Sequence, residues 1–132
     1  MDKVKKVFVN GTFDVLHIGH LRLLNYAKEH GDYLLVAIDS DRRIEEKKGP
    51  GRPINHYNDR REFLLNLESV DEVQEFDSDQ DLTDIVKDYQ PDVMIVGAEY
   101  KDGTVIGSEH AKELKFFERI YGYSTTRIVD RR

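Results

Sequence analysis

The stretch that decides the fold is residues 7–24, which read VFVNGTFDVLHIGHLRLL. An apolar run over Val7–Val9 stops at Asn10 and Gly11, and this pattern is typical of a β-strand that ends in a turn. Apolar residues with helical spacing begin at Ile18, which predicts a helix. The segment between them is small and polar, and the carboxyl end of a strand before a helix is where α/β sheets bind phosphate. This segment is therefore either a phosphate site or a polar turn.

Strands and helices alternate along the rest of the chain. Near-continuous apolar strands indicate burial on both faces of a parallel sheet, and a strand–helix–strand unit is nearly always a right-handed crossover. The sequence therefore predicts one α/β domain over residues 1–132, a Rossmann-like open parallel sheet of about five strands with helices on both faces. The expected strands are 4–10, 33–38, 72–76, 92–96 and, with a helix as the alternative, 115–120. The expected helices are 18–29, a short one over 41–48, one capped by Asn58 or Asp59 that runs to about residue 68, 81–89 and 125–129.

The composition excludes several classes of protein. The chain has a net charge of −6, so broad binding to nucleic acid or to a membrane surface is not expected. Cysteine is absent, which excludes disulfides, thiol catalysis and cysteine metal sites. No apolar run approaches the length of a membrane span, and residues 1–3 do not open a signal peptide. We therefore expect a cytoplasmic protein.

Residues 39–58 form the longest irregular stretch, and it is basic although the protein is acidic. The Gly-Pro-Gly-Arg-Pro run at 49–53 cannot be a regular element. The stretch is either an anion-binding flap or a solvated loop. Its cations are Arg42, Arg43, Lys47, Lys48 and Arg52.

His17 and His20 lie three positions apart, across Gly19, where the first helix is expected to begin. That spacing places both imidazoles on one face of the helix. Each ring can donate a hydrogen bond to a phosphate oxygen, and the helix N-terminus adds free N–H groups and a positive dipole end. The alternative is two surface histidines. Zinc is less expected, because no third ligand lies nearby in the sequence.

Residues 11–20, GTFDVLHIGH, resemble the signature of the small nucleotidylyltransferases. More narrowly, they resemble the group that contains glycerol-3-phosphate cytidylyltransferase and the adenylyltransferase domain that makes ADP-activated heptose. The resemblance covers nearly the whole chain and ends at residues 122–128, GYSTTRI. It implies that an acceptor phosphate oxygen attacks the α-phosphorus of a nucleoside triphosphate and that pyrophosphate leaves. Catalysis of that kind depends on positioning and on charge stabilisation.

The resemblance also implies roles for single residues. His17 and His20 contact the triphosphate and support the pentavalent transition state, and Lys48, or Lys47 in another register, contacts the transferring phosphate. Asp14 lies by the acceptor or helps to hold a divalent metal. Arg60 matches an acceptor-side arginine, with a capping and helix-surface pair with Asp59 as the alternative. The implied nucleotide-binding residues are Gly11, Thr12, Phe13, Gly19, Gly97, Arg119, Ser124, Thr125 and Thr126.

The base and the acceptor stay open at the sequence level. Residues 51–55, 105–109 and 122–124 look more like the heptose adenylyl branch, whereas Arg119 looks more like the cytidylyl branch. Glu99 stands where both branches are expected to have aspartate, and archaeal FMN adenylyltransferases share a similar first motif. We expect adenylyl transfer from ATP to a sugar phosphate, with CTP and glycerol-3-phosphate as the alternative pair and a non-catalytic nucleotide-binding regulator as a third possibility.

Two further expectations concern the metal and the assembly. Mg²⁺ is expected, because a triphosphate and an acceptor phosphate repel each other until they are neutralised. The family resemblance implies a homodimer.

Overall fold

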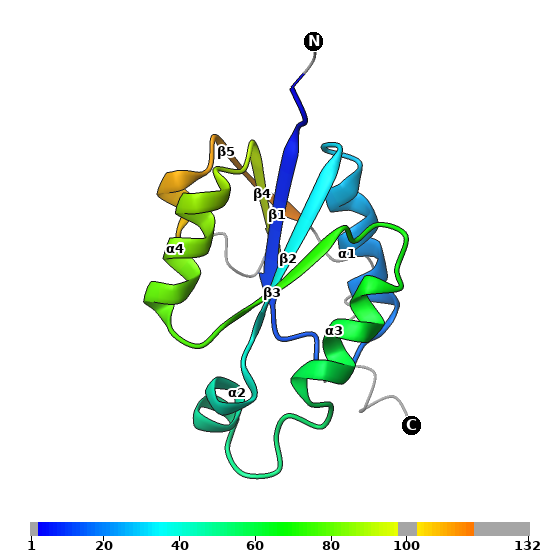
Figure 1. Ribbon diagram of the computed structural model, residues 1–132, viewed down its shortest axis with the longest axis vertical. Coiled ribbons are helices and arrows are strands. Elements are labelled where there is room, and N and C mark those ends of the chain that lie inside the picture. The colour runs from blue at the N-terminus through cyan, green and yellow to red at the C-terminus, as the bar shows by residue number, and fades with distance from the viewer. Residues whose placement is uncertain (1–2, 98–102, 118–132) are drawn as a thin grey trace.

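The computed structural model describes residues 3–97 and 103–117. Strands and helices alternate along these residues, as the sequence predicts (Figure 1). The elements are β1 (Lys6–Gly11), α1 (Ile18–Lys28), β2 (Tyr33–Asp39), α2 (Asp41–Lys48), α3 (Tyr57–Leu65), β3 (Glu72–Phe76), α4 (Asp79–Tyr89), β4 (Val93–Gly97), the 3₁₀ turn η2 (Ser108–His110) and β5 (Glu113–Phe117).

The five strands form one parallel sheet in the order β3-β2-β1-β4-β5. This confirms the predicted Rossmann-like α/β fold. The chain adds strands to one side of β1 and then moves to its other side with β4, so the strand order reverses between β1 and β4. In open α/β sheets, ligands bind at such a reversal, outside the carboxyl ends of the strands.

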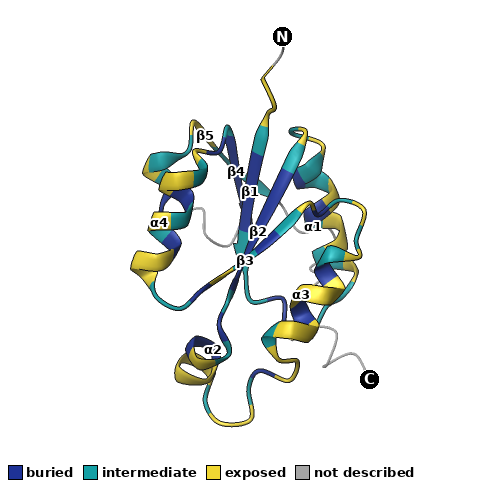
Figure 2. Ribbon diagram, in the orientation of Figure 1, coloured by how far each residue is buried: buried dark blue, intermediate teal, exposed yellow. Residues whose placement is uncertain are grey.

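Helices cover both faces of the sheet, and the alternation of side chains along β1 explains why. Helices α1 and α3 cover one face of the sheet, and α4 covers the other (Figure 1). Val7 and Val9 pack on the first face, and Phe8 packs on the second. All three are at most 1 % exposed. Figure 2 shows the strand interiors as buried and each of these helices as buried on one side only. The short helix α2 lies beyond the carboxyl ends of the strands, outside both layers (Figure 1).

Three sequence predictions about the ends of elements need correction or completion. Helix α3 begins after His56 without a side-chain cap, so the predicted cap by Asn58 or Asp59 is wrong: the N–H groups of Asp59 and Arg60 instead donate to the His56 carbonyl. Helix α4 begins earlier than predicted, because the Ser78 side chain caps it. Pairing with β4 makes residues 113–117 a strand rather than a helix. The helix predicted over 125–129 lies outside the described residues.

Of the helices in the described part of the chain, none is both long enough and apolar enough to span a bilayer.

Candidate phosphate-binding site

A pocket of about 350 Å³ lies at the carboxyl ends of β1, β2 and β4, where the strand order reverses. The strand ends form its floor, α2 forms one wall, and the segment before η2 forms another. Both apolar and charged side chains line it. Those central to the argument are Gly11, Thr12, Asp39, Arg43, Lys47, Lys48, Gly97 and the segment Thr104–Ile106.

The two histidines build the N-terminus of α1 together. His17 is the N-cap, and its Nδ1 accepts a hydrogen bond from the Gly19 N–H at 3.0 Å. Nδ1 of His20 accepts one from the His17 N–H at 3.2 Å. A ring nitrogen that accepts carries a lone pair, so each neutral imidazole holds its proton on Nε2, the atom with which it can donate. The ring centroids are 4.0 Å apart, which confirms that both imidazoles share one face of the helix.

The turn after β1 has an unusual backbone conformation and close packing between its residues. Phe13 has φ of +50°, in the left-handed region that non-glycine residues rarely adopt. Its ring packs under Gly11, where an added Cβ would lie 2.8 Å from the ring atom Cε2. The same ring lies 5.3 Å from the His20 ring, centroid to centroid. The fit between Gly11 and Phe13 therefore joins the end of β1 to the histidine pair. We call residues 11–14 the phosphate turn.

Asp14 ends the phosphate turn and fixes the loop over residues 49–56. Its carboxylate is buried and accepts from the Asn55 N–H at 2.7 Å, the Ile54 N–H at 2.9 Å and Arg52 Nε at 3.1 Å. Burial raises the pKa of this carboxyl, but the three donors outweigh burial and hold the pKa below its usual value. The Asn55 side chain also donates to the Asp14 carbonyl at 2.6 Å. Asp14 is therefore ionised and already has partners.

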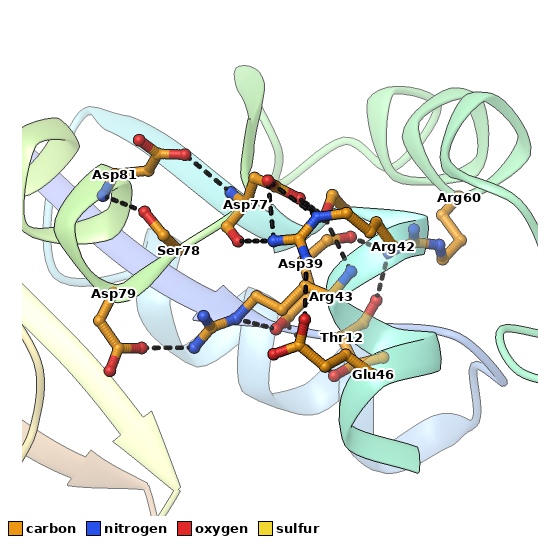
Figure 3. Close-up of polar contacts among 11 residues, drawn as sticks. Thr12, Asp39, Arg42, Arg43, Glu46, Arg60, Asp77, Ser78, Asp79 and Asp81 are labelled. Atoms are coloured by element: carbon orange, nitrogen blue, oxygen red, sulfur yellow. Dashed lines mark hydrogen bonds and ion pairs between the residues drawn. The ribbon is translucent and has the colours of Figure 1, made fainter. Parts of the chain in front are cut away.

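The arginines of α2 pair with carboxylates of the protein. Arg43 donates to Asp39 at 3.0 Å and to Asp79 at 2.6 Å, and its guanidinium lies 5.2 Å from the centre of the Phe76 ring (Figure 3). Arg42 pairs with Asp77 and Glu46 at the surface. Because these carboxylates already neutralise them, the arginines supply little net charge for a bound anion. Of the cations in the predicted anion-binding flap, the lysines therefore remain as the candidates to bind an anion.

Lys47 and Lys48 line the pocket from the last turn of α2. They stand at the end of the short helix that the sequence predicts over 41–48, and the Ser40 side chain caps its beginning. Within residues 3–97 and 103–117, Lys48 has no carboxylate within 4.0 Å, and the same holds for Lys47. Both lysines line the pocket, so the choice between the two registers stays open.

Arg60 is buried inside the molecule rather than exposed to the pocket. Its side chain is 1 % exposed. Nη1 donates to the carbonyls of Thr12 at 3.0 Å and Asp39 at 2.8 Å. Nε donates to the Asn55 carbonyl at 2.9 Å, and Nη2 pairs with Asp41 at 2.7 Å. The alternative of a surface pair with Asp59 is therefore wrong, and the predicted contact between Arg60 and the acceptor gains no support from this geometry.

Comparison with known proteins bears on what this pocket does. The model of a family described as cytidylyltransferase-like matches residues 8–131, nearly the whole chain. The chain belongs to the cytidylyltransferase-like family. This confirms the resemblance found in residues 11–20 and the predicted enzyme class, nucleotidyltransferase.

Several curated proteins are similar to this chain over most of its length. It is 44% identical over 125 residues to the bifunctional protein HldE of Campylobacter fetus and 45% identical over 129 residues to that of Campylobacter concisus. These matches cover 95% and 98% of this chain but 27% of each relative, so the chain spans about a quarter of their length.

A solved structure supports the fold. The lipopolysaccharide core biosynthesis protein from Thermoplasma volcanium has a TM-score of 0.72 to this structure at 24% identity. The match covers 89% of this chain and 100% of that chain.

The cytidylyltransferase-like site holds residues that sequence reasoning missed. Asp39 lines the pocket, yet sequence reasoning assigned it no role, and Arg43, which also lines it, was counted only among the cations of the basic stretch. The position of Asp39 directly after a buried strand is a signal that could have identified it. Gly97 lies in the pocket as expected, and Gly19 lies in the first turn of α1. Four predicted nucleotide-binding residues lie outside the described residues: Arg119, Ser124, Thr125 and Thr126.

Proposed function

We propose that this chain transfers an adenylyl group from ATP to a small sugar phosphate and releases pyrophosphate. The observation that carries the proposal is the reciprocal cap of His17 and His20. It makes Nε2 the donor atom of each ring at the start of α1, which follows β1. The two rings line a second cavity of about 220 Å³ together with Leu16 and Phe63, whereas Lys47 and Lys48 line the strand-end pocket. Donors of this kind suit the oxygens of a triphosphate.

The reaction forms one bond and breaks one. An oxygen of the acceptor phosphate bonds to the α-phosphorus while the bond from that phosphorus to the bridging oxygen breaks, and pyrophosphate carries the electron pair away. Nε2 of His17 and of His20 donates to the triphosphate oxygens, and Lys47 or Lys48 neutralises charge on the transferring phosphate. These contacts matter most where charge develops in the transition state.

A divalent cation such as Mg²⁺ fits this donor set. The described residues contain no cluster of three or more His, Cys, Asp or Glu side chains that could enclose a metal. Mg²⁺ typically binds one or two carboxylates, water and the substrate phosphates, so it needs no such cluster. The carboxylates at the ends of β1 and β2 are Asp14, which already accepts three hydrogen bonds from the 49–56 loop, and Asp39, which lines the pocket. The ion would neutralise the phosphates.

The nucleotide and the acceptor rest on similarity. The resemblance of residues 51–55 and 105–109 to the heptose adenylyl branch, and the identity to proteins named HldE, favour ATP and a heptose phosphate. The homodimer and the cytoplasmic location belong to the same proposal. Analytical ultracentrifugation tests the first, and cell fractionation tests the second.

Pyrophosphate release tests the proposal. The purified protein is mixed with Mg²⁺, with ATP, CTP, GTP or UTP in turn, and with a panel that includes heptose 1-phosphate, other sugar phosphates and glycerol-3-phosphate. We expect release with ATP and a sugar phosphate. Release only with CTP and glycerol-3-phosphate would replace the proposed substrates, and tight nucleotide binding without release from any pair would indicate a regulator.

A further inference from the structure

In the described part of the chain, the largest buried polar side chain outside the pocket lining is that of Arg60, and its contacts join four separate segments. Its guanidinium bonds the phosphate turn at Thr12, the end of β2 at Asp39, the start of α2 at Asp41 and the 49–56 loop at Asn55. Figure 3 shows Arg60 beside Thr12 and Asp39, behind the network of α2. Three of the four acceptors are backbone carbonyls, so Arg60 fixes the direction of peptide groups.

The bond to the Thr12 carbonyl has a directional consequence. The peptide between Thr12 and Phe13 is trans, and in a planar trans peptide the C=O and the N–H point in opposite directions. The hydrogen bond from Arg60 directs the Thr12 C=O toward the interior between α2 and α3. The N–H of Phe13 must then point away from Arg60.

That N–H has no protein partner among the residues that the structure describes. Across the described residues, the Phe13 N–H donates to no protein acceptor, although Phe13 is 4 % exposed. A backbone donor in so buried a residue is normally satisfied. The positive φ of Phe13 also marks a strained backbone, and such strain is commonly kept at ligand-binding turns.

We propose that Arg60 is a positioning residue that turns the Thr12–Phe13 peptide so that the Phe13 N–H meets the α-phosphate of the nucleotide. The inference rests on the proposed nucleotidyl transfer. Arg60 touches neither substrate. Its ion pair with Asp41 also ties the turn to α2, so the backbone donor and the lysines keep a fixed separation.

Kinetics give the first test, with Arg60→Lys as the main variant because it keeps the positive charge but lacks the planar fork of donors. We expect kcat to fall roughly 10²-fold while KM changes little, as for a misplaced group that acts in the transition state. Arg61→Ala, in the exposed neighbour, should leave kcat unchanged. Leu64→Ala, one turn along α3, controls for lost stability: it should lower Tm at least as much as Arg60→Lys and keep kcat.

The second test does not require turnover. Selective ¹⁵N-phenylalanine labelling gives six amide signals, one for each phenylalanine in the chain, and Phe13→Leu identifies the signal of residue 13. The probe is α,β-methylene ATP with Mg²⁺. We expect it to shift the Phe13 amide downfield in the wild type and in Arg61→Ala, but not in Arg60→Lys.

The outcomes separate the two proposals. A wild-type Phe13 response that persists in Arg60→Lys, or its absence in the wild type, overturns the inference. If the wild type shows the response but releases no pyrophosphate with any substrate pair, the inference stands and the proposed function fails. If the wild type releases pyrophosphate but its Phe13 amide does not shift, the inference fails and the proposed function stands.

Discussion

At the scale of single residues, the proposed function gives His17 two roles that use two different ring nitrogens. Nδ1 caps α1 by accepting the Gly19 N–H, and the neutral ring then carries its proton on Nε2, the atom that donates to the triphosphate in the proposed function. Helix stability and ligand binding are therefore separable by substitution.

Substitution of His17 by asparagine tests this separation. Asparagine is a good N-cap but has no group in the place of Nε2, so His17→Asn should keep the free energy of unfolding within about 0.5 kcal/mol of the wild type. Its kcat should fall on the order of 10²-fold or more. His17→Ala should lose activity to a similar degree and about 1 kcal/mol of stability as well. Urea unfolding and pyrophosphate release measure the two quantities. Wild-type kcat in His17→Asn would refute the assigned donor.

At the scale of elements, the 49–56 loop is fixed by a single carboxylate. Asp14 binds two backbone N–H groups and one arginine of that loop, and its own turn carries the strained Phe13. The loop therefore depends on the ionisation of Asp14.

This dependence predicts how acid affects stability. The pKa of Asp14 lies below its ordinary value of 3.8 in the folded protein, so its stabilising contribution is complete above that value and is lost as the pH falls through the folded pKa. Asp14→Asn, which leaves N–H donors facing an amide, should cost about 1–3 kcal/mol near neutral pH. The difference from the wild type should narrow below about pH 4. Urea unfolding across this pH range measures it, with Asp59→Asn on the exposed side of α3 as the control. Parallel profiles for wild type and Asp14→Asn would contradict the prediction.

The sequence predicted the elements better than their connections. The apolar run Val7–Val9 and the helical spacing after Ile18 are local patterns, so β1 and α1 were found correctly. The buried position of Arg60 depends on three carbonyls that come together only in the folded chain. The one local hint was its spacing of four from Leu64, which shares the buried side of α3. Phe13 at positive φ had no signal, since neither its residue type nor its neighbours require that backbone.

At the scale of the whole molecule, the two ends of the sheet have different roles. The pocket lies at the carboxyl ends of the strands, whereas packing and hydrogen bonds stabilise the amino ends, such as the bond that the Lys6 N–H donates to the Asp92 carboxylate. At both ends the side chains are closely packed, so added atoms lower stability. Two substitutions that lower stability equally should therefore lower activity more at the carboxyl ends of the strands than at the amino ends.

Two glycines offer a matched pair for this comparison. A Cβ at Gly11 would lie 2.8 Å from the Phe13 ring beside the pocket, and one at Gly31 would lie 2.7 Å from the Lys5 carbonyl at the far end. Each alanine variant should lose about 1–3 kcal/mol of stability. Gly11→Ala should also lose most of its kcat, measured below the Tm of both variants, and Gly31→Ala should keep it. Equal loss of kcat in both variants would refute the different roles of the two ends of the sheet.

The ring protons assigned by the cap of α1 also limit the choice of nucleophile. A histidine that holds its proton on Nε2, with Nδ1 occupied by a backbone N–H, has no free lone pair with which to deprotonate an incoming group. An alcohol would have to lose its proton to some other base before attack. A phosphate monoester is already an oxyanion near neutral pH and needs no base. For the proposed transfer, the way this helix begins therefore favours acceptors that arrive ionised over plain hydroxyl groups as attacking nucleophiles.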